Sequence, residues 1–148
     1  MSVPRIVLIV VGAITTVSAV LADLLIPQLA AQHAFNPRWP PHAKFHDAQY
    51  MVMTVLLGLI GLALVLRPGP AVRARLLYAT AILATPWLGM IGALLVPGTA
   101  AYDPEFADRT VFLLGLHGQI LMAIVLLLAL GGTAAALLRT APEPATRR

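Results

Sequence analysis

The sequence predicts an all-α integral membrane protein built as a four-helix bundle. Of its 148 residues, 59% are hydrophobic and only 11% are charged, and the mean hydropathy is +0.88. A soluble domain carries about 25% charged residues, so this chain has too few polar side chains to cover a surface in water. In lipid each backbone amide must be paired within its own segment, which favours helices. The chain has no cysteine, which excludes disulfides, thiolate metal ligands and cysteine nucleophiles.

Four apolar stretches are long enough to cross a membrane, because about 20 apolar residues span the hydrocarbon core. They cover approximately residues 6–27, 47–66, 76–96 and 111–138. The first stretch has a run of uncharged residues longer than the 7–15 residues typical of a signal peptide, so we predict that it is a helix of the bundle. Residues 1–140 then form one transmembrane domain, and residues 141–148 form a polar tail.

The basic residues predict the orientation of the bundle. The N-terminus, the loop after the second helix and the C-terminus share one side of the membrane and carry seven of the ten basic residues: Arg5, Arg67, Arg73, Arg75, Arg139, Arg147 and Arg148. The other side carries three: Arg38, Lys44 and Arg109. The positive-inside rule therefore predicts cytoplasmic termini in a bacterial-type plasma membrane or its equivalent. The basic charge is explained by topology and lipid headgroups, and we expect no nucleic-acid partner.

The chemically active side chains gather toward the opposite, outer face. All four histidines lie there, together with five of the six acidic residues: Asp23, Asp47, Asp103, Glu105 and Asp108. Asp23 ends the first helix, while His117 and Gln119 are expected one to two turns inside the fourth. At a rise of 1.5 Å per residue, these groups come to one level. We therefore predict a cavity in the outer half of the bundle, roofed by residues 28–45.

Residues 33–49, HAFNPRWPPHAKFHDAQ, hold three of the four histidines. Pro40-Pro41 suits the first turn of a helix, and Trp39 is placed to anchor the connection at the membrane interface. If the helix begins there, its spacing puts four side chains on one face: His42, His46, Gln49 and Met53. A neighbouring face carries Asp47, Tyr50 and Thr54. His33, in the loop, is expected to contribute little.

The run FNPRWPPHAKFHDAQ, preceded by a first helix that bears Asp23, resembles a family of small four-helix membrane proteins of unassigned function. More distantly, the layout is similar to the EXPERA group, which includes the emopamil-binding sterol isomerase and the sigma-2 receptor. That resemblance implies a cavity for hydrophobic, often sterol-like or amine ligands, and double-bond migration by protonation and deprotonation. It matches Asp23 by position in the first helix, and Asp47 or His46 by position in the second. The HAKFH arrangement and His117 have no counterpart in that group.

The favoured function is acid–base chemistry, isomerase- or cyclase-like, on a lipophilic small molecule that enters from the lipid. Histidine can give or take a proton at neutral pH, and a neighbouring carboxylate can orient it. His46 and His117 are the expected proton-transfer pair, with Asp47 and Asp23 orienting them or stabilising a cation. No cofactor is favoured for this chemistry, although a divalent metal is possible. The residues expected to contact the substrate are Trp39, His42, Gln49, Tyr50, Met53, Trp87 and Gln119.

Two other functions stay open from the sequence. His42 and His46, four residues apart on a helix, could bind a divalent metal such as zinc or non-haem iron with His117 as third ligand. Alternatively the protein binds a lipophilic ligand or membrane lipid without turnover, or serves as an accessory subunit, because a fold does not fix a function. Metal analysis would test the first alternative, and turnover by the isolated protein would test the second. The oligomeric state is left open.

Overall fold

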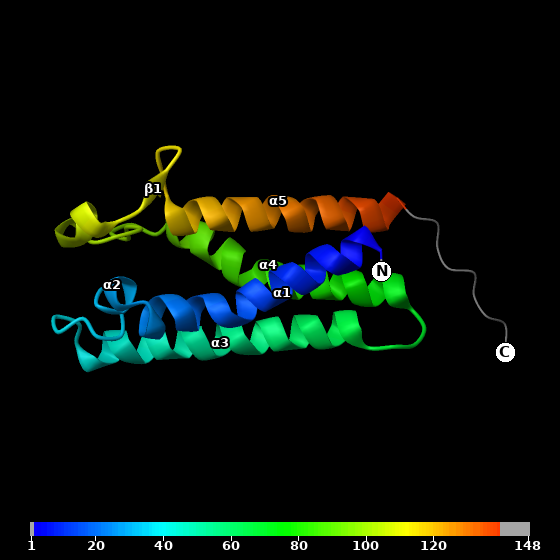
Figure 1. The fold of residues 1–148 in the computed structure, drawn as a ribbon, viewed down its shortest axis with the longest axis horizontal. Coiled ribbons are helices and arrows are strands. Elements are labelled where there is room, and N and C mark those ends of the chain that lie inside the picture. The colour runs from blue at the N-terminus through cyan, green and yellow to red at the C-terminus, as the bar shows by residue number, and fades with distance from the viewer. Residues whose placement is uncertain (1, 140–148) are drawn as a thin grey trace.

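A computed structural model describes residues 2–139 and confirms an all-α bundle of four long apolar helices (Figure 1). Each of the four is long and apolar enough to cross a membrane. They are α1, Val3–Val20, with its continuation η1, Leu21–Leu25; α3, Pro41–Leu66; α4, Val72–Ala93; and α5, Gly118–Arg139. The second helix begins at Pro41, as the paired prolines predict. The polar tail, residues 141–148, lies outside the described residues.

The closest helix packing is between α1 and α3, which run side by side in Figure 1. A methyl group added at Gly58 would lie 2.7 Å from the backbone nitrogen of Thr16, and one added at Gly61 would lie 2.6 Å from Leu83. Glycines let helix backbones approach in lipid, where association depends on close packing. Gly58 and Gly61 are buried and fix which face of α3 turns inward.

The inward face of α3 is not the one that carries His42 and His46. The buried positions of the helix are Met51, Thr54, Gly58, Gly61 and Val65. Extended by one further turn, this stripe reaches the partly buried Tyr50 and Asp47. The other predicted face, His42, His46, Gln49 and Met53, is exposed, with Met53 at 49%. That face was expected to line a cavity, which is wrong because the glycine contacts rotate it outward.

The core of the bundle contains Trp87, which was expected to contact a substrate. Its side chain is 1% exposed, and its indole Nε1 donates a hydrogen bond to Thr15 Oγ1 at 3.0 Å. A buried indole N–H needs such a partner. Trp87 packs with Leu8, Leu83 and other apolar side chains of the core, so its role is structural.

The last helix begins later than the sequence suggested. Residues 111–138 were expected to be helical, but β1, Phe112–Leu113, and β2, Leu116–His117, form an antiparallel hairpin in which Phe112 pairs with His117. Leu114 and Gly115 form its turn, with φ of 53° and 77°. Two successive positive φ angles are typical of a tight hairpin turn. The apolar composition of this segment hid the turn, so His117 lies just before α5 rather than inside it.

Two segments close one end of the bundle, and we call them together the cap. The first is residues 26–40, with the short helix α2, Pro27–Ala30; the second is residues 94–117, with the 3-10 helix η2, Pro104–Arg109, and the hairpin. Both lie at the left of Figure 1. An ion pair between Arg38 and Glu105 joins them. The sequence predicted a roof from residues 28–45 alone and missed the second segment.

The opposite end of the bundle is fastened by arginines that donate to backbone carbonyls. Arg5 bonds to Leu66 O at 3.4 Å and Arg73 to Leu138 O at 3.1 Å, while Arg75 reaches Pro68 O at 2.9 Å. Carbonyls at helix C-termini lack intrahelical donors, so basic side chains are favourable there. The two ends of the bundle therefore differ sharply in chemistry.

Candidate functional site

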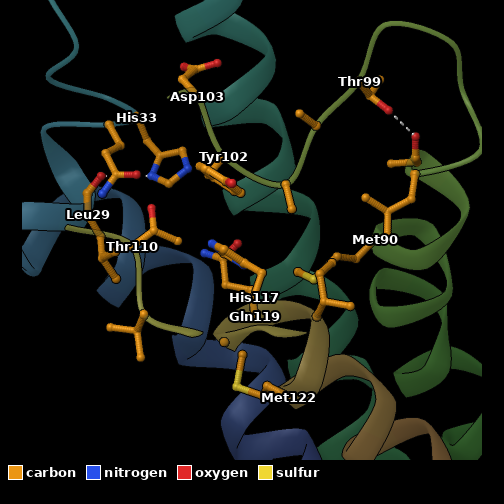
Figure 2. Close-up of a pocket in the computed structure, with 18 of the residues that line it drawn as sticks. Leu29, His33, Met90, Thr99, Tyr102, Asp103, Thr110, His117, Gln119 and Met122 are labelled. Atoms are coloured by element: carbon orange, nitrogen blue, oxygen red, sulfur yellow. Dashed lines mark hydrogen bonds between the residues drawn. The ribbon is translucent and has the colours of Figure 1, made fainter. Parts of the chain in front are cut away.

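A cavity of about 530 Å³ lies beneath the cap (Figure 2). Its volume is in the range of sites for small molecules, about 300–1,000 Å³. The polar side chains lining it include His33, Tyr102, Asp103, Thr110, His117 and Gln119. Its apolar wall includes Leu29, Met90, Leu94, Ile120 and Met122. The cavity therefore has a polar part and an apolar part, which suits a lipophilic molecule that carries a reactive or polar group.

The π-helical turn η1 at the end of the first helix holds Asp23. The amide of Ile26 bonds to Leu21 O at 2.8 Å, an i→i−5 contact, and such π turns occur often at functional sites. Asp23 is 5% exposed. A carboxylate so deeply buried requires a partner, and the structure supplies His33.

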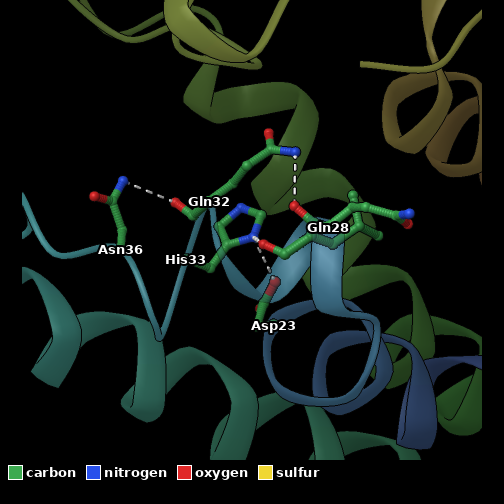
Figure 3. Close-up of polar contacts among 6 residues, drawn as sticks. Asp23, Gln28, Gln32, His33 and Asn36 are labelled. Atoms are coloured by element: carbon green, nitrogen blue, oxygen red, sulfur yellow. Dashed lines mark hydrogen bonds and ion pairs between the residues drawn. The ribbon is translucent and has the colours of Figure 1, made fainter. Parts of the chain in front are cut away.

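The pairing of Asp23 with His33 defines the chemistry of His33 (Figure 3). His33 Nδ1 lies 3.1 Å from Asp23 Oδ1 and 2.9 Å from Leu29 O. A carbonyl and a carboxylate both accept hydrogen bonds, so Nδ1 carries a proton. The ring lines the cavity beside Tyr102 (Figure 2), which makes Nε2 the nitrogen available to a bound molecule.

The segment that carries His33 is held by amide side chains. Gln32 Nε2 donates to Gln28 O at 3.1 Å, and Asn36 Nδ2 donates to Gln32 O at 3.3 Å (Figure 3). Asn36 is 1% exposed, and its Oδ1 accepts from the Arg38 amide at 2.9 Å. Trp39 meets the His33 ring edge to face, with centroids 5.8 Å apart. These contacts fix the His33 ring on the cavity wall.

His117 enters the same cavity from the hairpin. Its ring stacks parallel to Tyr102 with centroids 6.1 Å apart, and its edge meets Phe112 at 6.2 Å. Its Nδ1 is buried and has no hydrogen-bond partner within the described part of the chain. Burial, and then the charge of a protonated His33, lower the pKa of His117 below its ordinary value. His117 is accordingly a neutral imidazole at pH 7, with a nitrogen ready to accept a proton.

The histidines that share a cavity are thus His33 and His117. His46 was expected to face His117, and this is wrong because His46 lies on the exposed face of α3. Its Nε2 is 3.1 Å from His42 Nε2, and its Nδ1 is 3.2 Å from Gln49 Oε1. Among residues 2–139, no group of three or more histidine and acidic side chains is placed to hold a metal ion, and His117 does not join His42 and His46.

Two residues of the inward face of α3 lie behind the Asp23–His33 pair. Asp47 interacts electrostatically with both His33 and Asp23, and its Oδ2 is buried without a hydrogen-bond partner in the described chain. Tyr50 is partly buried one turn further along α3 and interacts electrostatically with both acids. Neither side chain lines the cavity itself. Asp47 therefore interacts electrostatically with His33 and Asp23 without lining the cavity.

The expected site residues consequently separate into three groups. The first lines the cavity: His117, Trp39 and Gln119. The second supports it from behind: Asp23, Asp47 and Tyr50. The third lies elsewhere: His42, His46, Gln49, Met53 and Trp87. Sequence reasoning missed His33, Tyr102, Asp103 and Thr110. Pro27 directly after the Asp23 turn signals a chain reversal that could have brought His33 back to Asp23.

The fold and site define an integral membrane four-helix protein with a histidine-lined cavity beneath a two-segment cap. The family model described as a family of unknown function (DUF6640) matches residues 8–141, and the chain belongs to that family. No curated protein matches the chain, and no solved structure matches it.

Proposed function

We propose that the protein is a membrane enzyme that performs acid–base chemistry on a lipophilic small molecule, as an isomerase or cyclase does. One observation carries the proposal: His33, paired with Asp23, and His117, whose Nδ1 has no hydrogen-bond partner among the described residues, line one cavity. Two ionisable groups with different hydrogen-bond surroundings in one cleft are what acid–base catalysis needs.

The two histidines take different roles because their surroundings differ. The Asp23 carboxylate lies 3.1 Å from His33 Nδ1 and leaves Nε2 to the cavity, so we assign His33 as the acid that donates its Nε2 proton to a carbon–carbon double bond. His117 is neutral and accepts a proton from a second carbon of the resulting cation. One proton enters the substrate and one leaves, so the product is an isomer or a cyclised isomer. Exchange with solvent returns both histidines to their starting states.

The walls of the cavity suit this class of substrate. Leu29, Met90 and Met122 offer apolar contact, and Tyr102, stacked on His117, presents an aromatic face beside a developing cation, which is favourable. The likeness of the layout to the EXPERA group supports the same choice of ligand. By the count of basic residues we place the cap on the outer side of the membrane and both termini in the cytoplasm.

The test uses whatever molecule the protein itself retains. The protein is purified in mild detergent, lipophilic molecules that copurify are identified by mass spectrometry, and the same preparation is incubated in D2O. We expect deuterium in carbon-bound positions of the bound molecule, at a rate that falls in His33→Ala and His117→Ala. A molecule that binds but takes up no deuterium would overturn the catalytic proposal in favour of a carrier. The exposed variant Asp108→Asn is the control, since Asp108 lies at the surface beside Arg109.

A further inference from the structure

A second pair of histidines lies outside the cavity, on the exposed face of α3. His42 and His46 are one turn apart in the first two turns of the helix, and their Nε2 atoms are 3.1 Å from each other. Both side chains are exposed. His42 and His46 have no role in the proposed acid–base chemistry.

The two rings approach each other through their Nε2 atoms, which are 3.1 Å apart. His46 Nδ1 lies 3.2 Å from Gln49 Oε1, and an amide oxygen can only accept, so Nδ1 of His46 carries the proton and Nε2 carries the lone pair. His42 stacks on Phe45 with an interplanar angle of 7°, and Phe45 also meets His46 edge to face. Metal-binding histidines usually donate their other ring N–H to a hydrogen-bond acceptor, and Gln49 Oε1 is such an acceptor for His46.

We propose that His42 and His46 bind a divalent transition-metal ion through their Nε2 atoms. Bonds of about 2.05 Å to one ion put two nitrogens about 3.3 Å apart in a tetrahedral site and about 2.9 Å apart at a right angle. The observed 3.1 Å lies between these values. Imidazole ligands suit Zn²⁺, Cu²⁺ and Ni²⁺ and disfavour Mg²⁺ and Ca²⁺, which prefer oxygen.

The residues around His42 and His46 determine which further ligands the ion can have. Asp47, the adjacent carboxylate, is on the inward face of α3 with its Oδ2 buried, so it supplies no oxygen ligand. No third histidine or acidic side chain of the described residues joins the pair, so the remaining coordination positions are left to water. The site therefore holds one ion per chain through two protein nitrogens, and it is independent of the cavity and of the acid–base proposal.

The test titrates the full-length protein in detergent with Zn²⁺ alone, followed by calorimetry. We expect one equivalent of Zn²⁺ per chain. His42→Ala and His46→Ala should each weaken binding by about tenfold or more, because losing a ligand costs at least as much as losing its orienting partner. Gln49→Ala should weaken it less. His33→Ala, the matched change at a histidine of the cavity, should leave Zn²⁺ binding unchanged.

Two results would overturn the proposal. One is wild-type protein that binds no Zn²⁺ beyond what the His42→Ala/His46→Ala double variant binds. The other is a loss in His33→Ala as large as that in His46→Ala, which would move the ion to the cavity. Far-UV circular dichroism of each variant checks that the helices are intact, and we expect no loss because both histidines are exposed and outside the core. Titration with Mg²⁺ should give no heat of binding above dilution.

Discussion

Nδ1 of His33 lies 3.1 Å from Oδ1 of Asp23, and this contact ties the end of the first membrane helix to the cap over the cavity. The contact also satisfies a hydrogen-bonding requirement of both side chains. The buried carboxylate gains a donor, and the histidine gains a fixed orientation with Nε2 left for the cavity. The contact therefore links the fold directly to the proposed chemistry.

Asp23→Asn should nearly abolish turnover while leaving the bundle folded. The amide keeps the size of the side chain but removes the carboxylate that accepts from His33 Nδ1. General acid–base groups contribute about 10²- to 10⁴-fold to a rate, so we expect a loss of at least about 10²-fold in deuterium uptake by the bound molecule. Asp108→Asn, an exposed change of the same chemistry, should keep the wild-type rate. Equal rates in the two variants would contradict the role of Asp23.

His117 makes the protein sensitive to acid. Its pKa is lowered by burial and by the charge of His33, so the folded state prefers the neutral ring. Below the ordinary pKa of about 6.5, the unfolded chain binds more protons at this residue than the folded chain does. Stability therefore falls as the pH drops through that value, until His117 titrates in the folded protein. The thermal midpoint should fall more between about pH 7.5 and pH 5 in wild type than in His117→Gln, and equal falls would contradict this.

Gly58 tests the packing that turns the histidines of α3 outward. A methyl group there would lie 2.7 Å from the Thr16 backbone nitrogen, so Gly58→Ala should destabilise the bundle by about 1–3 kcal/mol, as overpacking does. Gly131, also within a membrane helix, has nothing within 4 Å of an added methyl group. Gly131→Ala should be neutral or stabilising by up to about 1 kcal/mol through helix propensity. Denaturant unfolding in detergent compares the two, and equal stabilities would contradict the packing.

The orientation can be measured directly because the chain has no cysteine. A single cysteine at Phe35, which is 64% exposed in the cap, should react with an impermeant maleimide added to intact cells. One at Gly69, in the loop between α3 and α4, should react only after the cells are opened. The reverse pattern would place the cap in the cytoplasm.

The helices were predictable because lipid imposes a simple rule on composition. The four apolar stretches, the start of α3 at Pro41 and the single bundle all follow from hydropathy and proline chemistry. The hairpin before α5 was not predictable from the sequence, because Phe112, Leu113 and Leu116 are as apolar as the helix that follows. Its two positive-φ residues, Leu114 and Gly115, carry only a weak signal in sequence.

The sequence predicted the depth of the site along the bundle, but it did not predict which residues contact one another there. Asp23, Asp47 and His117 do meet near one end of the bundle, as the depth argument indicates. The face of α3 that turns inward depends on where Gly58 and Gly61 pack. Helical spacing shows which residues share a face, but it does not show which face is buried. His33 was undervalued because a loop residue gains its role only when the chain folds back, and that depends on the π turn at Leu21–Leu25.

The central claim is that His33 and His117 act on one molecule in one cavity. The most direct measurement is deuterium uptake by the bound molecule in His33→Ala, His117→Ala and the double variant. Residues that act as a unit are not additive, so the double variant should be no slower than the slower single variant within about threefold. Losses that multiply, or a wild-type rate in either single variant, would contradict the account.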